Sequence, residues 1–196
     1  MIETDRFRFP LASDSERRFV LSFYLVDGTL SVFEVPVPNS GIKGGKFLER
    51  VLVPKAIGRS GVDGIPAYIA SQDLFIGARI NVFSRVFEII GADEFTLGCM
   101  EANKSRYPVA DFPAVIAKLK KAIKEGPDQM ADRLRVALIR QQQDGNVNVQ
   151  ESGLQDAFKE CSLPLVKHEV KTISRALDPE GRGIDTRSLM SCIGLE

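Results

Sequence analysis

The sequence predicts an α+β protein with a β-rich first half and an all-α second half, and three observations support this prediction. Hydrophobic and polar residues alternate on both sides of Asp27-Gly28, which is typical of a β-hairpin. From residue 113 the hydrophobic period changes to 3.6 residues, which is typical of amphipathic helices. Glycine-containing breaks at 125–127, 144–146 and 181–183 then divide this second half into short helices.

The first half contains several antiparallel strands and one helix. The apolar face of the first hairpin comprises Phe19, Leu21, Phe23, Leu25, Leu30 and Val32. Pro36 and Pro38 end its second strand. We expect a third strand over 47–54 and a further hairpin that turns at Ser84-Arg85.

Asp93 is suited to cap a short helix that follows these strands. One face of that helix would contain Phe95, Leu97 or Gly98, and Cys99 with Met100. Antiparallel strands closed by one helix indicate a small barrel or sandwich with a helix plugging one end.

The second half contains four apolar helical faces. They comprise Val115, Leu119 and Ile123; Met130, Leu134 and Leu138; Leu154, Phe158 and Cys161; and Val166, Val170, Ile173 and Leu177. Two loops that contain aspartate and glycine separate these helices. The pattern therefore predicts a pair of helix–loop–helix units.

The composition argues against membrane and nucleic-acid partners. Of 196 residues, 44% are hydrophobic and 27% charged, and no apolar run approaches the roughly 20 residues of a membrane span. The formal net charge is zero, so the chain lacks the basic excess that phosphate neutralisation demands. Its start has no signal-peptide core. Three widely spaced cysteines fit reduced thiols. We therefore expect a cytoplasmic or cytoskeletal location.

The glycine-rich stretch "NSGIKGGKFLER", residues 39–50, does not fit a phosphate-binding loop. Counting back from Gly45-Lys46, Ser40 occupies the first glycine position and Phe47 the position of the magnesium-binding hydroxyl. The residues that follow favour a strand and not a helix. A nucleotide-binding enzyme is therefore a distant third hypothesis, and the glycines indicate a connection between strands.

Two loops resemble degenerate calcium-binding loops, whose ligands stand at positions 1, 3, 5, 7, 9 and 12. In the later loop Asp178 suits position 1. If Gly183 is at position 6, position 12 is Leu189; if Ile184-Asp185 are at positions 8 and 9, the loop is one residue short and ends on Ser188. In the earlier loop, placing Gly145 at position 6 puts Glu151 at position 12 but Arg140 at position 1. We therefore expect no high-affinity calcium site and a helix pair that folds without calcium.

Other chemistry is sparse. His168 is the only histidine, so a catalytic triad could be built only around it. It falls roughly opposite the Val166–Val170 stripe, beside Glu169 and Lys171, and is expected at the surface. The cysteines lack zinc-ligand spacing. We expect a protein that is not an enzyme and that has no catalytic residues, no cofactor and no metal.

Several stretches in the first half resemble the DM-ten domain. They are "RRFVLSFYLVDGTLSVFEVPVPNSGIKGGKFLER", "YIASQDLFIGARI" and "VFEIIGADEFTLGCMEAN", in that order over roughly residues 16–103. The helical remainder resembles the degenerate EF-hand pair that follows the last such domain in the myoclonin-type ciliary proteins. The chain thus resembles the terminal unit of those proteins, with one DM-ten domain where they usually have three.

This resemblance implies a fold and a role. The fold is a pleckstrin-homology-like β-barrel capped by a helix. The role is that of a microtubule inner protein, which lines axonemal doublet microtubules of cilia or flagella and stabilises the tubulin lattice. The implied partners are α/β-tubulin and neighbouring microtubule inner proteins.

We expect three segments: an extended arm over 1–15, a DM-ten domain over 16–104 and an EF-hand-like helical domain over 105–196. The residues expected to bind a partner are Phe7 and Phe9 in the arm, and Asn39, Lys43, Lys46 and Arg50 in and after the glycine-rich stretch. The alternatives are that the two phenylalanines fold back onto the barrel, that Lys43 is only solvated and that the Lys46 stem packs on the barrel.

The expected function is that of a non-enzymatic structural protein that binds tubulin. The alternative is a calcium-responsive regulatory module of the cytoskeleton.

Overall fold

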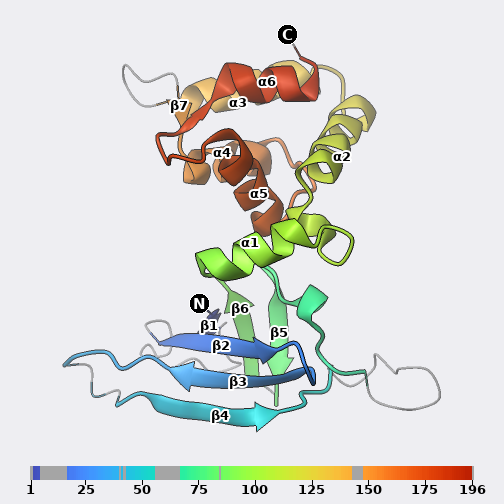
Figure 1. Ribbon diagram of the computed structural model, residues 1–196. Coiled ribbons are helices and arrows are strands. Elements are labelled where there is room, and N and C mark those ends of the chain that lie inside the picture. The colour runs from blue at the N-terminus through green and yellow to red at the C-terminus, as the bar shows by residue number, and fades with distance from the viewer. Residues whose placement is uncertain are drawn as a thin grey trace. The chain divides into compact units, whose positions relative to one another are not determined.

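The computed structural model describes residues 2–4, 17–39, 41, 43–55, 67–83, 85–142 and 148–195. The chain divides into two compact units, Met1–Thr96 and Leu97–Glu196, each of which has its own hydrophobic core. We call them the β unit and the helical unit (Figure 1). Each is described by itself.

The β unit is built on one antiparallel sheet of six strands in the order β4-β3-β2-β1-β6-β5. The strands are β1 (Ile2–Thr4), β2 (Arg18–Tyr24), β3 (Thr29–Glu34), β4 (Gly45–Val51), β5 (Arg79–Val82) and β6 (Arg85–Ile89), with a 3-10 helix, η3 (Ser71–Asp73), before β5. Both predicted hairpins are confirmed; Ser84, in the second turn, lies outside the described residues.

The β2–β3 hairpin forms as the sequence predicts. Gly28 supplies a positive φ of 70° in its turn, and the Thr29 backbone N–H and hydroxyl both donate to Asp27 Oδ1. Six residues of each strand pair in continuous register from Phe19–Glu34 to Tyr24–Thr29. Phe19, Leu30 and Val32 are buried, whereas Leu25 lies in the turn and is 61% exposed.

β4 begins two residues before the predicted third strand and ends three residues earlier. The ladder between β3 and β4 shifts register around Val32. At the start of β4 two backbone segments nearly touch: a Cβ added to Gly44 would lie 2.7 Å from the Pro36 nitrogen and 2.8 Å from the Glu34 carbonyl oxygen. The glycine-rich stretch therefore permits a close backbone approach, as its composition indicates.

Strand β1 lies inside the region predicted to be an extended arm. Ile2–Thr4 pairs with β2 on one side and with β6 on the other, with Ile2 opposite Phe19 and Ile89. The rest of the predicted arm, including Phe7 and Phe9, lies outside the described residues. An extended segment that meets two unpaired strand edges satisfies their backbone groups, which the sequence pattern of the arm did not reveal.

The sheet is open in the described part of the chain, so the closed barrel expected from the sequence is not found. β4 and β5 are its two ends and do not pair with each other. The sheet bends, so that β5 and β6 cross the direction of β2, β3 and β4 (Figure 1). Beyond β4, Val53 and Lys55 bond to Ile69 and Ala67. The chain thus curls round the core without completing the ladder.

The core of the β unit contains a group of three aromatic rings. Phe19, Phe47 and Phe87 meet edge to face with centroids 5.1 to 5.8 Å apart. Such pairs add to the stabilisation that burial itself provides. They join strands β2, β4 and β6, which come from distant parts of the sheet.

Helix α1 (Glu94–Ala102) contains the boundary between the two units. Asp93 caps it as predicted, because its carboxylate accepts hydrogen bonds from the Thr96 backbone N–H (2.8 Å) and hydroxyl (2.9 Å). These bonds hold the pKa of Asp93 below its ordinary value. Leu97 and Met100 are buried, but Phe95 is 81% exposed. The prediction that Phe95 shares their face is wrong.

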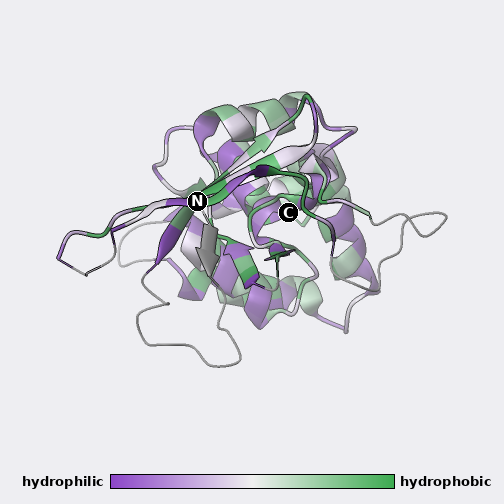
Figure 2. Ribbon diagram, turned by 90° about the horizontal axis from the view of Figure 1, so that it is seen from below, coloured by the Kyte–Doolittle hydropathy of each residue, from purple (hydrophilic) through white to green (hydrophobic). Residues whose placement is uncertain are grey.

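The helical unit continues with η4 (Pro108–Ala110), α2 (Phe112–Glu125), α3 (Met130–Arg140), α4 (Glu151–Glu160), α5 (Lys167–Leu177) and α6 (Thr186–Ile193), and with the short strands β7 (Asn148–Val149) and β8 (Ile184–Asp185). Hydrophobic and hydrophilic residues alternate along these helices (Figure 2). Every predicted apolar face contributes to one shared core, which includes Leu119, Leu134, Leu154 and Ile173 at 0% exposure. No helix in the described part of the chain is long and apolar enough to cross a membrane.

Candidate functional site

Two helix–loop–helix units face each other across a small antiparallel sheet. The first is α3, β7 and α4, and the second is α5, β8 and α6; Val149 lies opposite Ile184, and Asn148 lies opposite Asp185. Both Val149 and Ile184 are 1% exposed. This pairing is the arrangement of an EF-hand-like pair, and it aligns the two loops residue by residue.

The second loop is closed by its own hydrogen bonds. The Asp178 carboxylate accepts from the backbone N–H groups of Arg182 (2.8 Å) and Gly183 (2.7 Å). Asp185 caps α6 by accepting from Arg187 and Ser188, and the Ser188 hydroxyl donates to it at 2.8 Å. The Ser188 hydroxyl is the main reason why the pKa of Asp185 lies below its ordinary value. The carboxylates that could face a cation are therefore already engaged with the protein.

The alignment decides the numbering of the loops. Gln150 and Asp185 are the N-caps of α4 and α6. Because they stand at equivalent places, both take position 9 of their loops. Ser188 then occupies position 12 of the second loop, which is the shorter of its two predicted registers. In the first loop position 12 falls on Gly153, and the predicted assignment of Glu151 to that position is wrong.

The first loop is tightly packed at the position of a closing carboxylate. A Cβ on Gly153 would lie 3.0 Å from Gln141 Cβ and 3.0 Å from Val149 Cγ1. Glu151 instead pairs with Lys171, whose Nζ lies 2.9 Å from the Glu151 Oε2. Residues 143–147 lie outside the described residues. No cluster of three or more potential metal ligands is found in the described residues.

The buried positions of His168 and Glu169 correct the expectation of a surface histidine. They are 2% and 6% exposed, because α2 and η4 pack on α5 in addition to the neighbouring helices. Glu169 accepts both bonds of the Lys118 ammonium at 2.8 Å and caps the Val166 backbone N–H. Burial lowers the pKa of His168, and the charges of Glu101 and Glu169 oppose that shift only in part. Burial thus favours the neutral form of His168.

The residues expected to bind a partner take different roles. Asn39 (φ 61°) and Lys43 are exposed near the β3–β4 connection. Lys46 is 66% exposed, and its Nζ lies 3.0 Å from Glu49 Oε1. Phe7 and Phe9 are outside the described residues. Asn39 and Lys43 thus lie in the β3–β4 connection and Lys46 at the start of β4, whereas Arg50 lies near the end of that strand.

Arg50 holds the tip of the β2–β3 hairpin. Its guanidinium lies 2.6 Å from Asp27 Oδ2, donates to the Thr29 hydroxyl at 2.8 Å and stacks 3.8 Å from the Tyr24 ring centroid. The hydrogen bonds from Thr29, and then the Arg50 guanidinium, hold the pKa of Asp27 below its ordinary value. Any role of Arg50 in partner binding stays a prediction.

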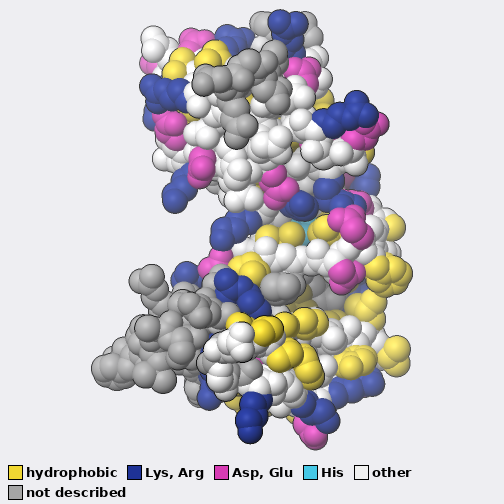
Figure 3. Space-filling view, turned by 90° about the vertical axis from the view of Figure 1, so that its left-hand side faces the viewer, with side chains coloured by type: hydrophobic (Ala, Val, Ile, Leu, Met, Phe, Trp, Pro, Cys, Tyr) yellow, Lys and Arg dark blue, Asp and Glu magenta, His cyan; other side chains and the backbone are white. Residues whose placement is uncertain are grey.

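The outer face of the sheet carries an apolar group that was not predicted from the sequence. Val20 pairs with Phe33, and Phe33 pairs with Lys46, so the three side chains form a row across β2, β3 and β4. Val20 is 44% and Phe33 49% exposed. The period-2 pattern contained the signal, because it assigns every residue of a strand to one of the two faces and so places Val20 and Phe33 on the face opposite the core. Figure 3 shows exposed hydrophobic side chains on the β unit with Lys and Arg side chains beside them.

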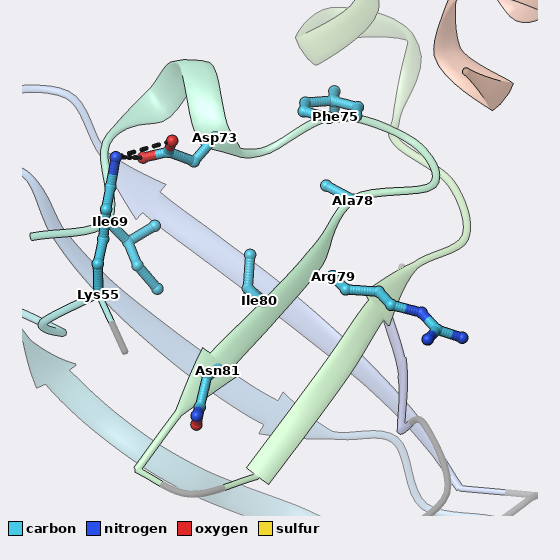
Figure 4. Close-up of a pocket in the computed structure, with 8 residues that line it drawn as sticks. All are labelled: Lys55, Ile69, Asp73, Phe75, Ala78, Arg79, Ile80 and Asn81. Atoms are coloured by element: carbon cyan, nitrogen blue, oxygen red, sulfur yellow. Dashed lines mark hydrogen bonds and ion pairs between the residues drawn. The ribbon is translucent and has the colours of Figure 1, made fainter. Parts of the chain in front are cut away.

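The β unit also contains a cavity of about 410 Å³ beside strand β5 (Figure 4). Ile69, Phe75 and Ile80 contribute apolar walls. Its Lys55 and Asp73 side chains pair with each other at 2.8 Å, and Asp73 also caps the Ala70 N–H. Lys55 and Asp73 are therefore engaged in holding η3 against the segment after β4, and Arg79, which also lines the cavity, lies 3.6 Å from Glu88 Oε2. Among the described residues that line it, none forms a nucleophile–base pair.

Residues 6–96 match the DM10 domain, which is the DM-ten domain of the sequence analysis. EF-hand domain-containing family member C2 of Bos taurus is 43% identical over 108 residues, which are 55% of this chain and 15% of that protein. EF-hand domain-containing protein 1 of Homo sapiens is 33% identical over 182 residues, which are 92% of this chain and 27% of that protein.

The similarity to the human protein extends over both units, whereas the domain match lies in the β unit. The chain spans less than a third of the length of either relative. The chain therefore carries a DM10 domain and is a relative of the EF-hand domain-containing proteins.

Proposed function

We propose that this protein is a non-enzymatic structural protein of the cytoskeleton that binds tubulin. In this proposal it is a microtubule inner protein that stabilises the doublet microtubules of a ciliary or flagellar axoneme. The proposal rests on the DM10 domain and on the role that the family resemblance implies. The observation on the molecule that supports it is the exposed row of Val20, Phe33 and Lys46 on the outer face of the sheet.

The chemistry of this row suits an acidic protein surface with apolar spots. Val20 and Phe33 offer adjacent apolar area, which gains free energy when a partner removes it from water. The ion pair of Lys46 with Glu49 is exposed on both sides, and such pairs contribute little. The Lys46 ammonium can therefore exchange Glu49 for a carboxylate of the partner, and Lys43 adds a second exposed cation.

The calcium-responsive alternative is less well supported. Gly153 stands where the closing carboxylate of the first loop would be, and Ser188 stands there in the second. High calcium affinity depends on that bidentate carboxylate. The internal hydrogen bonds of Asp178 and Asp185 give the second loop its shape without an ion.

Co-sedimentation of the full chain with assembled microtubules tests the proposal. Phe33→Glu places a carboxylate at the centre of the row, and we expect it to weaken binding about tenfold or more. Phe95→Glu is the matched control, because Phe95 is also an exposed phenylalanine of the β unit. Equal binding by both variants, or no sedimentation of the wild-type chain, would refute the proposal. Location of the tagged protein along axonemes after detergent extraction tests the cellular part.

A further inference from the structure

The helical unit has an open groove that is lined by residues of α3 and α6. None of the described residues fills it. Its volume is about 510 Å³, within the range of ligand sites in proteins. Leu138, Ile139, Met190 and Leu195 provide its apolar lining. Leu138 belongs to the core, but Ile139 is 63% exposed. Ile139 therefore presents to solvent a large apolar side chain whose burial would require a partner.

The charged side chains that line the groove in the described part of the chain are both arginines. Arg135 and Arg187 line it, and no Asp or Glu is among its lining residues in the described part of the chain. The Arg135 guanidinium is fixed in place, since it lies 3.2 Å from Asp132 Oδ1 and donates to the Leu195 carbonyl oxygen at 2.7 Å.

Arg187 stands in the first turn of α6, where the helix dipole disfavours a cation and favours an anion. The carboxylate of Asp185, which caps this turn, already accepts three hydrogen bonds from Arg187 N–H, Ser188 N–H and the Ser188 hydroxyl. An anion brought by a partner would thus meet both arginines and the N-terminal end of α6.

We propose that the α3–α6 groove binds an acidic amphipathic helix of a partner protein. Apolar side chains of that helix at i, i+3 or i+4 would cover Ile139 and enter the space between Leu138 and Met190, as in other helix-in-groove complexes. Its carboxylates would face Arg135 and Arg187, which line the groove. This inference is independent of the proposed tubulin contact, because the groove lies in the helical unit.

Selection from a displayed library of random peptides of about 16 residues, roughly four helical turns, tests the inference with the full chain as bait. We expect enriched peptides to carry several Asp and Glu residues with apolar residues at helical spacing. We expect their affinity to fall about tenfold for Ile139→Asp, which removes the exposed anchor and adds a like charge. Enrichment of neutral or basic sequences, or no enrichment above the Ile139→Asp bait, would overturn it.

Two matched controls separate the groove from its neighbourhood. Val136→Asp changes another exposed apolar residue of α3 that lines a different hollow, and it should leave binding unchanged. Arg187→Glu should weaken binding and its salt dependence, whereas Arg182→Glu, which changes an exposed arginine outside the groove, should not. Equal losses within either pair would also contradict the proposed groove.

Discussion

Gly183 is a residue of the second loop that lies close against Asn148 of β7. Its φ is 100°, and an added Cβ would lie 2.9 Å from Asn148 Cβ. Gly181 has a φ of 70° but nothing within 4 Å of an added Cβ. We expect Gly183→Ala to lower the free energy of unfolding by about 2–4 kcal/mol, and Gly181→Ala by about 1–2 kcal/mol because it strains only the backbone.

Chemical denaturation of both variants measures this difference. Equal losses would show that the contact with Asn148 relaxes without cost.

His168 should make the stability of the protein depend on pH. Burial lowers its pKa below the ordinary 6.5, so as the pH falls the unfolded chain takes up this proton before the folded chain does. The stabilisation that neutral His168 provides is therefore complete above pH 6.5 and is lost as the pH falls through 6.5 towards the lower pKa of the folded state. Within that window the loss is at most about 1.4 kcal/mol per pH unit.

Denaturation between pH 7.5 and about 5 tests this, a range in which the ordinary carboxylates stay ionised. His168 is the only histidine, so His168→Gln should remove the histidine-linked slope over that window. The charged groups that act on the pKa of His168, which are Glu101, Glu169 and Arg175, remain in the variant. A slope that persists in His168→Gln would assign the effect to another group.

Single residues were predictable where their role is local. Asp27, Gly28 and Asp93 act within a few residues of their own position, and their chemistry identified the turn and the cap. His168 was misplaced because its burial depends on η4 and α2, which lie about 50 residues earlier. A helical wheel shows one apolar face, and it does not show how many neighbours cover the helix.

Among the elements, β1 makes the clearest prediction. It pairs with β2 and β6 at the centre of the order of the sheet, so its loss exposes two strand edges. Glu3→Pro removes a backbone donor at a position paired on both sides, and we expect the free energy of unfolding to fall by about 2–4 kcal/mol. Glu3→Ala keeps the backbone intact and serves as the control. Equal stability of the two variants would show that β1 adds little to the sheet.

The loop pair makes a second prediction at this scale, namely that the helical unit folds without calcium. A site with micromolar affinity would raise the free energy of unfolding by about 4 kcal/mol in millimolar calcium. We expect thermal melts of the full chain in calcium and in chelator to coincide. Titration calorimetry provides an independent measurement. A binding isotherm in the micromolar range, with a matching rise of Tm, would support the regulatory alternative.

The elements were predicted better than their pairings. The helical periods indicated each apolar face, because a helix that is buried on one side has apolar residues at every third or fourth position. The register of the first loop was not predicted, since Gly145 suggested one numbering and the β7–β8 pairing requires another. That pairing joins Asn148 with Asp185 and Val149 with Ile184, which are 37 and 35 positions apart in the chain, and no local pattern reports it.

At the scale of the whole molecule, the presence of two cores predicts that a core substitution destabilises mainly the unit in which it is made. Phe87 and Leu134, both 0% exposed, belong to different cores. We expect Phe87→Ala and Leu134→Ala each to cost about 2–5 kcal/mol. Each should reduce amide hydrogen-exchange protection mainly in its own unit. Loss of protection across both units in either variant would show one cooperative structure.

The division into β-rich and helical halves was predictable because composition and period change along the chain. Closure of the sheet was not predictable, since the sequence pattern indicates the strands but not the angles between them. The bend between β2–β4 and β5–β6 and the bulged ladder of β3 with β4 decide whether edges meet, and both depend on packing across the core.

The close approach at Gly44 has a consequence for inherited variation. Every missense change at a glycine codon adds at least one carbon atom, and at this position that atom would lie 2.7–2.8 Å from the backbone of Glu34 and Pro36. Glu34 is the last residue of one strand, Pro36 follows just beyond it, and Gly44 directly precedes the next strand, so neither side can withdraw without moving the sheet. Gly44 is therefore a codon for which no amino-acid replacement is conservative, and a variant found there in a population deserves the same scrutiny as one in a buried core.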